Sequence, residues 1–180
     1  AAGSGQPASS PRLADLTPNR WVELHVQQPD DDGSFRRQGH GGSCFDTKRG
    51  RLILFGSDTH GSNWENSPLV FDPVGTKWSR LYPFDPPETY HVNEDGIPVA
   101  GKEGDHPWAM HTFGAVVHDP ERDEMVVASY PAHMVPGRFT NALEEVWPKA
   151  RQHPTWVFGL ASERWRPLDC KPIHFFPYCA

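Results

Sequence analysis

The chain has 180 residues, with 17 Lys and Arg against 23 Asp and Glu, and its formal net charge is −6. This acidic balance excludes the general nucleic-acid binder as a class, because such proteins need a basic surface to displace counterions from phosphates. No apolar run approaches the ~18 residues that a membrane-spanning helix needs. The 19 Pro and 16 Gly are too frequent for a helical protein and favour short strands joined by turns, in one domain or a large piece of one.

The two ends of the chain differ in composition from the middle. Residues 1–11 (AAGSGQPASSP) are small and polar and lack the basic start and apolar stretch of a signal peptide, so we predict a flexible lead over 1–19. A strand-like segment, RWVELHV, follows at 20–26, and we predict that the folded body covers 20–169 and a tail covers 170–180. The lead and the tail are left out of the fold prediction.

Three cysteines form neither a disulfide scaffold nor a zinc module, because no C-x-x-C pair is present. Cys44 lies in an apolar, strand-like run, which favours a buried free thiol. Cys170 and Cys179 are close in sequence, and a disulfide between them would require an oxidising compartment.

The body contains an internal repeat. The stretch GGSCFDTKRGRLILFGS at 41–57 aligns with GAVVHDPERDEMVVASY at 114–130, which places Asp46 on Asp119. Each copy has a glycine, a short apolar strand, an aspartate, a charged turn and a second apolar strand, the pattern of a hairpin. The repeat predicts that one strand–turn–strand unit occurs twice.

The similarity continues through a second hairpin in each copy. PLVFDPVGTKWSRL at 68–81 aligns with TWVFGLASERWRPL at 155–168, with the same Phe-to-Trp and Trp-to-Leu spacings. We therefore predict two four-stranded units, at about 36–83 and 107–169. A long connection at 84–106 separates them, and the second unit carries the longer internal loop, 131–154.

The residues that carry a family resemblance are the Gly41-Gly42 start, Phe55-Gly56, Phe71-Asp72-Pro73, and Trp78 with Leu81. This pattern resembles kelch repeats, of the galactose-oxidase-like β-propeller superfamily. The second unit departs from it, with Ser129-Tyr130 at the glycine position and Gly159 at that of Asp72. The resemblance implies an all-β fold, a kelch-like propeller portion of about two four-stranded antiparallel blades plus the preceding strand. The alternative is an antiparallel sandwich with coincidental Trp spacing.

If the units are blades, the inner-strand glycine and the outer-strand Trp each have a structural role. A glycine at the start of the inner strand lets that strand approach neighbouring backbone closely. The outer-strand Trp packs against the adjacent blade and buries a large area.

A complete propeller needs about four to eight blades to hide its sheet edges. Two blades and a strand are too few. We expect a fragment of a larger propeller, although other chains completing the ring, or long loops capping an arc, would also resolve the problem. The remaining blades, from another chain or a longer product, are thus expected partners.

Polar and aromatic residues gather in four loop segments. These are 57–66 (SDTHGSNWEN), 88–91 (ETYH), 106–113 (HPWAMHTF) and the long loop that begins at Tyr130. Loops on rigid sheets commonly hold functional sites. Because 57–66 and 130–138 follow equivalent strands, their histidines are expected to converge from adjacent blades. Each residue also has a structural alternative, as a solvated turn, a strand-start histidine or packing between blades. The candidates are His60, His133, Tyr90 and His111 as catalytic residues, and Arg138, Trp64 and Trp108 as substrate-binding residues.

This residue set suits β-elimination from a uronic-acid polysaccharide. Arg138 or a cation would stabilise charge beside the substrate carboxylate, while a His or Tyr would remove the adjacent proton and another would protonate the leaving oxygen. Trp64 and Trp108 would stack on sugar rings. Several histidines with a carboxylate also suit a divalent metal, but no local spacing motif identifies the ligands or the ion.

We therefore expect a carbohydrate-directed, secreted or periplasmic protein, and specifically a polyuronate lyase, since some polysaccharide lyases have propeller folds. The alternative is a non-catalytic kelch module that binds a protein or glycan, or a fragment without activity of its own. The copper-radical oxidases of the superfamily need a tyrosine crosslinked to a cysteine, and the sequence assigns no tyrosine to Cys44. The hydrolase signature G-x-S-x-G is absent. Nucleic acid and membrane are not expected partners.

Overall fold

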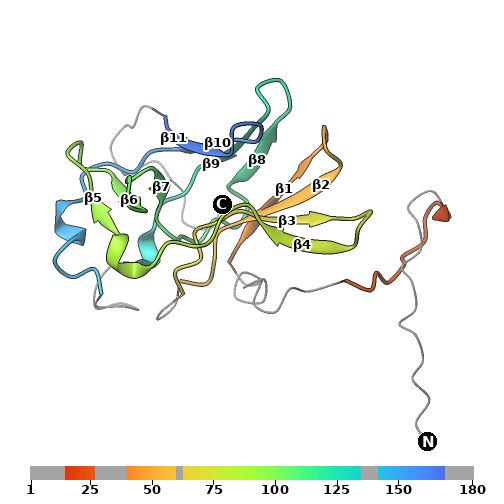
Figure 1. Cartoon of the computed structure of the whole chain (residues 1–180), viewed down its shortest axis with the longest axis horizontal. Helices are drawn as coiled ribbons and strands as arrows, with labels where there is room; N and C mark the ends of the chain where they lie inside the picture. Colours follow the sequence, from red (N-terminus) through yellow and green to blue (C-terminus); the bar gives the residue numbers. More distant parts are fainter. Residues whose placement is uncertain (1–14, 27–39, 60–62, 135–141, 169–180) are drawn as a thin grey trace, which may run out of the picture.

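The computed structural model describes residues 15–26, 40–59, 63–134 and 142–168. These residues form an all-β fold of three antiparallel sheets without an α-helix (Figure 1). No sheet closes on itself, so the described residues show the all-β class but not a propeller. Three short 3-10 turns join the strands: η3 (Pro87–Thr89), η4 (Ala132–Met134) and η5 (Trp147–Lys149).

Two of the sheets are the predicted four-stranded units, and in both the spatial order follows the chain order. The repeated pattern of strand, turn, strand, loop, strand, turn, strand is therefore confirmed. The first sheet contains β1 (Gly42–Asp46), β2 (Arg51–Phe55), β3 (Leu69–Asp72) and β4 (Lys77–Arg80), and the other contains β8 (Val116–Asp119), β9 (Glu124–Val127), β10 (Trp156–Gly159) and β11 (Arg164–Pro167).

The hairpin turns repeat in atomic detail. Asp46 Oδ1 accepts hydrogen bonds from two backbone amides of its turn, and Asp119 Oδ1 does the same in the second unit. This side-chain turn is a preferred role of aspartate. Each of the four hairpins also has one residue in the left-handed region at the same place, which confirms the alignment; these residues are Gly50 (φ 63°), Thr76 (47°), Asp123 (59°) and Glu163 (53°).

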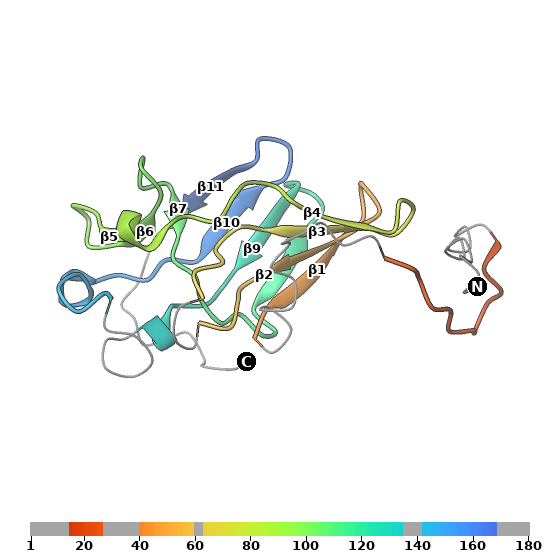
Figure 2. The same ribbon diagram turned by 60° about the horizontal axis from the view of Figure 1, so that its bottom comes forward.

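The main apolar core lies between the two four-stranded sheets, whose first strands, β1 and β8, lie side by side (Figures 1 and 2). Exposure alternates along β1, so Cys44 points into this core as a buried free thiol, as predicted. Burial, with a smaller effect of the Asp46 charge, raises the pKa of Cys44 to about 11. The outer-strand Trp165 packs on Phe55 of the other sheet, with ring centroids 4.7 Å apart, as predicted, whereas Trp78 packs on Phe71 of its own sheet, with ring centroids 4.9 Å apart.

The connection between the units contains a third sheet that the sequence analysis missed. Its strands are β5 (His91–Val92), β6 (Pro98–Ala100) and β7 (His106–Pro107). Strands of two or three residues are too short to display an alternating pattern. A second core cluster lies beside this sheet; its buried members are Trp64, Tyr90, Ala100, Trp108, Ala109, Met134 and Leu143.

The predicted strand at 20–26 is wrong. The segment has no strand geometry, and Trp21 is fully exposed. A single strand is not stable without a neighbour to satisfy its backbone and cover its apolar side chains. Figure 2 shows this segment, in red, apart from the sheets.

Among the residues that the structure describes, no helix has the length and apolar character that crossing a membrane requires.

Candidate functional site

The two four-stranded sheets are tied together where β1 and β8 begin. The carbonyl oxygen of His40 accepts hydrogen bonds from the amides of Thr112 (2.9 Å) and Phe113 (3.3 Å). The Thr112 hydroxyl accepts a 2.6 Å bond from the Gly42 amide and donates a 2.6 Å bond to the carbonyl of Phe55. One buried threonine thus fixes three backbone segments relative to one another.

A glycine is required at the start of β1 by the closeness of this junction. A Cβ atom on Gly42 would overlap the carbonyl oxygen of Phe113 and lie 2.8 Å from Val116 Cγ2. The prediction that a glycine permits close approach of the inner strand is confirmed here. Gly56, at φ 96°, is constrained in the same way, because a Cβ there would overlap the side chain of Thr112.

At this junction the structure brings together two imidazoles and a carboxylate, which we name the His40–Asp58–His111 cluster. One potential ligand atom from each residue lies within 4.8 Å of the other two. His40 Nδ1 is 3.6 Å from Asp58 Oδ1, and the two imidazole rings stack with centroids 4.0 Å apart. The three residues come from separate segments: the turn before β1, the loop after β2 and the stretch between β7 and β8.

The three side chains of the cluster differ in their exposure to solvent. His111 is 4% exposed, whereas the side chains of His40 and Asp58 are 26% and 42% exposed. The amide of Thr59 donates a long 3.4 Å hydrogen bond to His111 Nε2, so this nitrogen carries a lone pair. The cluster thus combines one fixed, buried imidazole with two more accessible groups.

An aromatic wall with a strained backbone borders the cluster. Phe113 has φ 44°, a conformation that costs a bulky residue of order 1–3 kcal/mol. Its ring lies edge-on to both imidazoles, with centroids 5.5 Å from His40 and 5.5 Å from His111. Strain of this kind concentrates at functional sites, where the surrounding structure enforces it.

The predicted site residues have different outcomes. His111 belongs to the cluster, together with Asp58 of the predicted polar loop; His40, the third member, was not a candidate. His60 and Arg138 lie outside the described residues, and so does the side chain of His133. The predicted convergence of His60 and His133 therefore stays a prediction.

Tyr90, Trp64 and Trp108 lie in the second core cluster instead. Tyr90 is 4% exposed, and burial raises the pKa of its hydroxyl well above the usual range. This hydroxyl donates to the carbonyl of Trp64 and accepts from the amide of Ala109, both at 3.2 Å. Trp108 is completely buried, and its indole N–H donates a 2.7 Å bond to the carbonyl of Val99. The packing interpretation is the one that the structure supports for these three residues.

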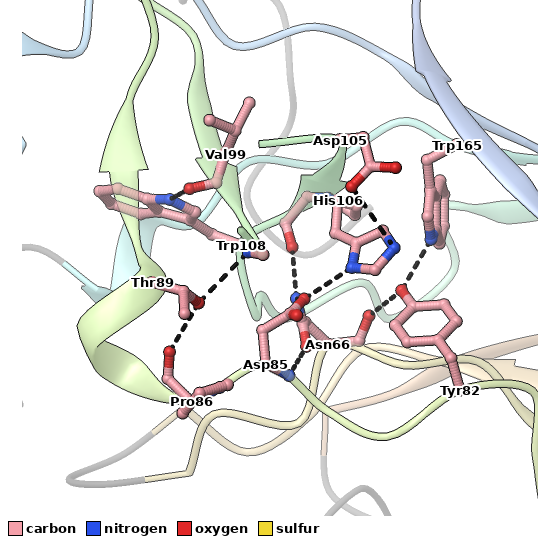
Figure 3. Close-up of polar contacts among 12 residues, drawn as sticks. Asn66, Tyr82, Asp85, Pro86, Thr89, Val99, Asp105, His106, Trp108 and Trp165 are labelled. Carbon is pink, nitrogen blue, oxygen red and sulfur yellow. Dashed lines mark hydrogen bonds and ion pairs between the residues drawn. The ribbon is translucent and has the colours of Figure 1, made fainter. Parts of the chain in front are cut away.

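A second polar group, which the sequence analysis did not identify, joins all three sheets (Figure 3). His106 Nδ1 lies 2.7 Å from Asp85 Oδ2, and Asn66 donates a 2.8 Å bond to the same oxygen. The ring of Tyr82 stacks on His106 at 4.3 Å, and its hydroxyl accepts a 2.7 Å bond from the Trp165 indole. The residues of this group come from the segments that flank the first sheet, from β7 and from β11. The group therefore has a structural role, because it joins the three sheets. Asp85 lies in a proline-rich segment whose pattern gives no sign of this partner.

A third group, Asp46–His118–Asp123, has the spacing of a cation site but already contains protein cations. Arg49 forms two 2.8 Å hydrogen bonds with Asp123, and Arg51 Nε lies 3.0 Å from Asp46 Oδ2. The Arg49 hydrogen bonds lower the pKa of Asp123 to about 2. This group is an ion-pair network that joins two hairpins.

Comparison with known proteins adds no family to this description. No protein-family model matches the sequence, and no curated protein matches it. The resemblance to kelch repeats stays a prediction from the sequence, and the function has to be argued from the His40–Asp58–His111 cluster itself.

Proposed function

We propose that the chain is a carbohydrate-directed protein with kelch-like blades, and that it cleaves a uronic-acid polymer at the His40–Asp58–His111 cluster. The observation that carries this proposal is the convergence of two imidazoles and a carboxylate from three segments. His60, one of the predicted catalytic residues, follows Asp58 by two residues in the sequence. A histidine that only lies in a solvated turn would not be surrounded by a second imidazole and a carboxylate.

The reaction that suits these groups is β-elimination. A base removes the proton beside the uronate carboxylate, and the electrons of that C–H bond form a C=C bond while the adjacent C–O bond breaks. The leaving oxygen takes up a proton, and no water is consumed. Arg138 or a cation would stabilise the charge that develops beside the substrate carboxylate, while histidines of the cluster and of the neighbouring loops would transfer protons.

The test is the ultraviolet absorbance of the conjugated double bond that elimination creates. We expect wild-type protein to generate this absorbance from polygalacturonate, alginate or a glycosaminoglycan. Asp58→Asn and His40→Ala should abolish it, whereas the matched change of an exposed histidine away from the cluster, His91→Ala, should not. Full activity in both cluster variants would refute the proposed site.

A non-catalytic binding module is the second candidate. It is favoured by the burial of Tyr90, the tyrosine proposed for proton transfer. If wild-type protein binds the polymer but generates no ultraviolet absorbance from it, the result would support this alternative.

The proposal includes partner blades. The side chains of Phe45 on β1 and Val117 on β8 are large, apolar and about half exposed, at 50% and 55%. Adjacent blades from another chain or a longer product would cover such faces. Light scattering with a thermal melt of the same sample tests this point. A stable oligomer with a cooperative melt indicates that chains complete the ring. A monomer that melts broadly or aggregates indicates an incomplete propeller, for which the activity assay needs the longer product.

A further inference from the structure

We infer that the His40–Asp58–His111 cluster binds one divalent first-row transition metal ion. Imidazole nitrogens suit Zn²⁺, Fe²⁺, Ni²⁺ and Cu²⁺, and three protein ligands leave coordination positions open for water or substrate. Ca²⁺ and Mg²⁺ prefer sites built from oxygen ligands, which this cluster does not provide.

The distances agree with a site that closes through small movements. Bonds of about 2.1 Å in a tetrahedral site place ligand atoms about 3.4 Å apart. The 3.6 Å between His40 Nδ1 and Asp58 Oδ1 is already close to this value. The largest separation allowed within the cluster, 4.8 Å, needs a contraction of about 1.4 Å, which side-chain rotation can supply.

The surrounding structure holds the ligands before any ion binds. The carbonyl of His40 is fixed by two amide hydrogen bonds, and Phe113 packs on both imidazoles. The bond from the Thr59 amide to His111 Nε2 is long, at 3.4 Å, and a metal ion bound at this nitrogen would take its place. Rigid neighbours of this kind keep metal ligands in a productive orientation.

An independent observation concerns the residues on either side of Asp58. The hydroxyls of Ser57 and Thr59 are buried and have no hydrogen-bond partner within the described parts of the chain. Buried polar groups without a partner are rare in native proteins, and a missing water or ion is one recognised cause. A water molecule or an ion beside segment 57–59 would supply such partners.

The third polar group provides an internal contrast. The potential ligand atoms of Asp46, His118 and Asp123 are also within 4.8 Å of one another, but arginine side chains already neutralise the charge of both carboxylates through hydrogen bonds. An ion at that group would have to displace Arg49 or Arg51. We therefore expect one bound ion per chain.

This inference deepens the proposed function, and its biological meaning rests on that function: the ion is the cation that would neutralise the uronate carboxylate. Its test uses the metal alone. Zn²⁺ affinity is measured by competition with a chromophoric chelator, and Co²⁺ serves as a spectroscopic probe of the ligand set. We expect one equivalent of Zn²⁺ per chain and visible Co²⁺ absorption bands.

Asp58→Asn and His40→Ala should each weaken Zn²⁺ binding at least tenfold and alter the Co²⁺ spectrum, while His91→Ala should leave both unchanged. Near-ultraviolet circular dichroism confirms that each variant is folded, and both changed residues are partly exposed, so neither removes a core side chain. Equal Zn²⁺ affinity in wild-type and the two cluster variants would overturn the inference. Metal binding without cleavage of any polymer, measured on a stable oligomer or on the longer product, would overturn the proposed lyase activity and leave the metal site standing.

Discussion

Replacement of Gly42 by alanine tests whether the junction below the cluster is as close as the structure indicates. The new methyl group would overlap the backbone carbonyl of Phe113, which cannot rotate away as a side chain can. Overpacking of this kind costs about 1–3 kcal/mol. The movement would also stretch the bond from the Gly42 amide to the Thr112 hydroxyl, worth about 1 kcal/mol. We expect a total loss of about 3 kcal/mol in the free energy of unfolding.

Urea unfolding followed by tryptophan fluorescence measures this loss. With a slope of about 1–3 kcal/mol per molar, the midpoint should fall by at least 1 M. Gly50→Ala is the matched control, because a Cβ at Gly50 meets no atom within 4 Å and only its φ of 63° opposes the change. That control should cost about 1 kcal/mol. A loss in Gly42→Ala no larger than in Gly50→Ala would refute the steric argument.

Two further predictions concern stability. Thr76→Gly should raise the urea midpoint by the equivalent of about 1 kcal/mol, because a β-branched residue at φ 47° is strained; a lower midpoint would contradict this. His153 is buried, and burial lowers its pKa from 6.5 to about 4. The unfolded state therefore binds a proton on this histidine more readily than the folded state does. The free energy of unfolding is highest above pH 6.5 and decreases as the pH falls from 6.5 toward 4. The loss should reach about 3 kcal/mol, and His153→Gln should flatten the dependence of the urea midpoint on pH across this interval; an unchanged slope would exclude His153 as its source.

Local patterns predicted those parts of the fold that depend on residues close in sequence. Asp46 and Asp119 mark equivalent turns because each aspartate bonds to the amides that directly follow it. The glycine at the start of β1 and the outer-strand Trp165 were also identified correctly, since each has a side-chain size that only one environment suits. The all-β class follows from these signals without knowledge of any long-range contact.

The missed features depend on contacts that no local pattern records. The β5–β7 sheet is made of strands of two or three residues, held by the packing of Trp108 and Tyr90 rather than by alternation. Trp108 was interpreted as substrate-binding and Tyr90 as catalytic, because aromatic residues in polar loops look alike in sequence whether they face solvent or a core. Segment 20–26 has the composition of a strand, but composition does not supply a neighbouring strand.

The position of the cluster follows from the repeat itself. In the alignment that superposes Asp46 on Asp119, His40 of the first unit corresponds to Phe113 of the second. Their rings pack together because β1 and β8 begin side by side, so the junction juxtaposes two equivalent positions. One copy supplies an imidazole and the other a strained aromatic wall, while Asp58 comes from the loop after β2 and His111 from the stretch between β7 and β8. The polar site thus needs an imidazole at one of the two equivalent positions together with side chains from two further segments.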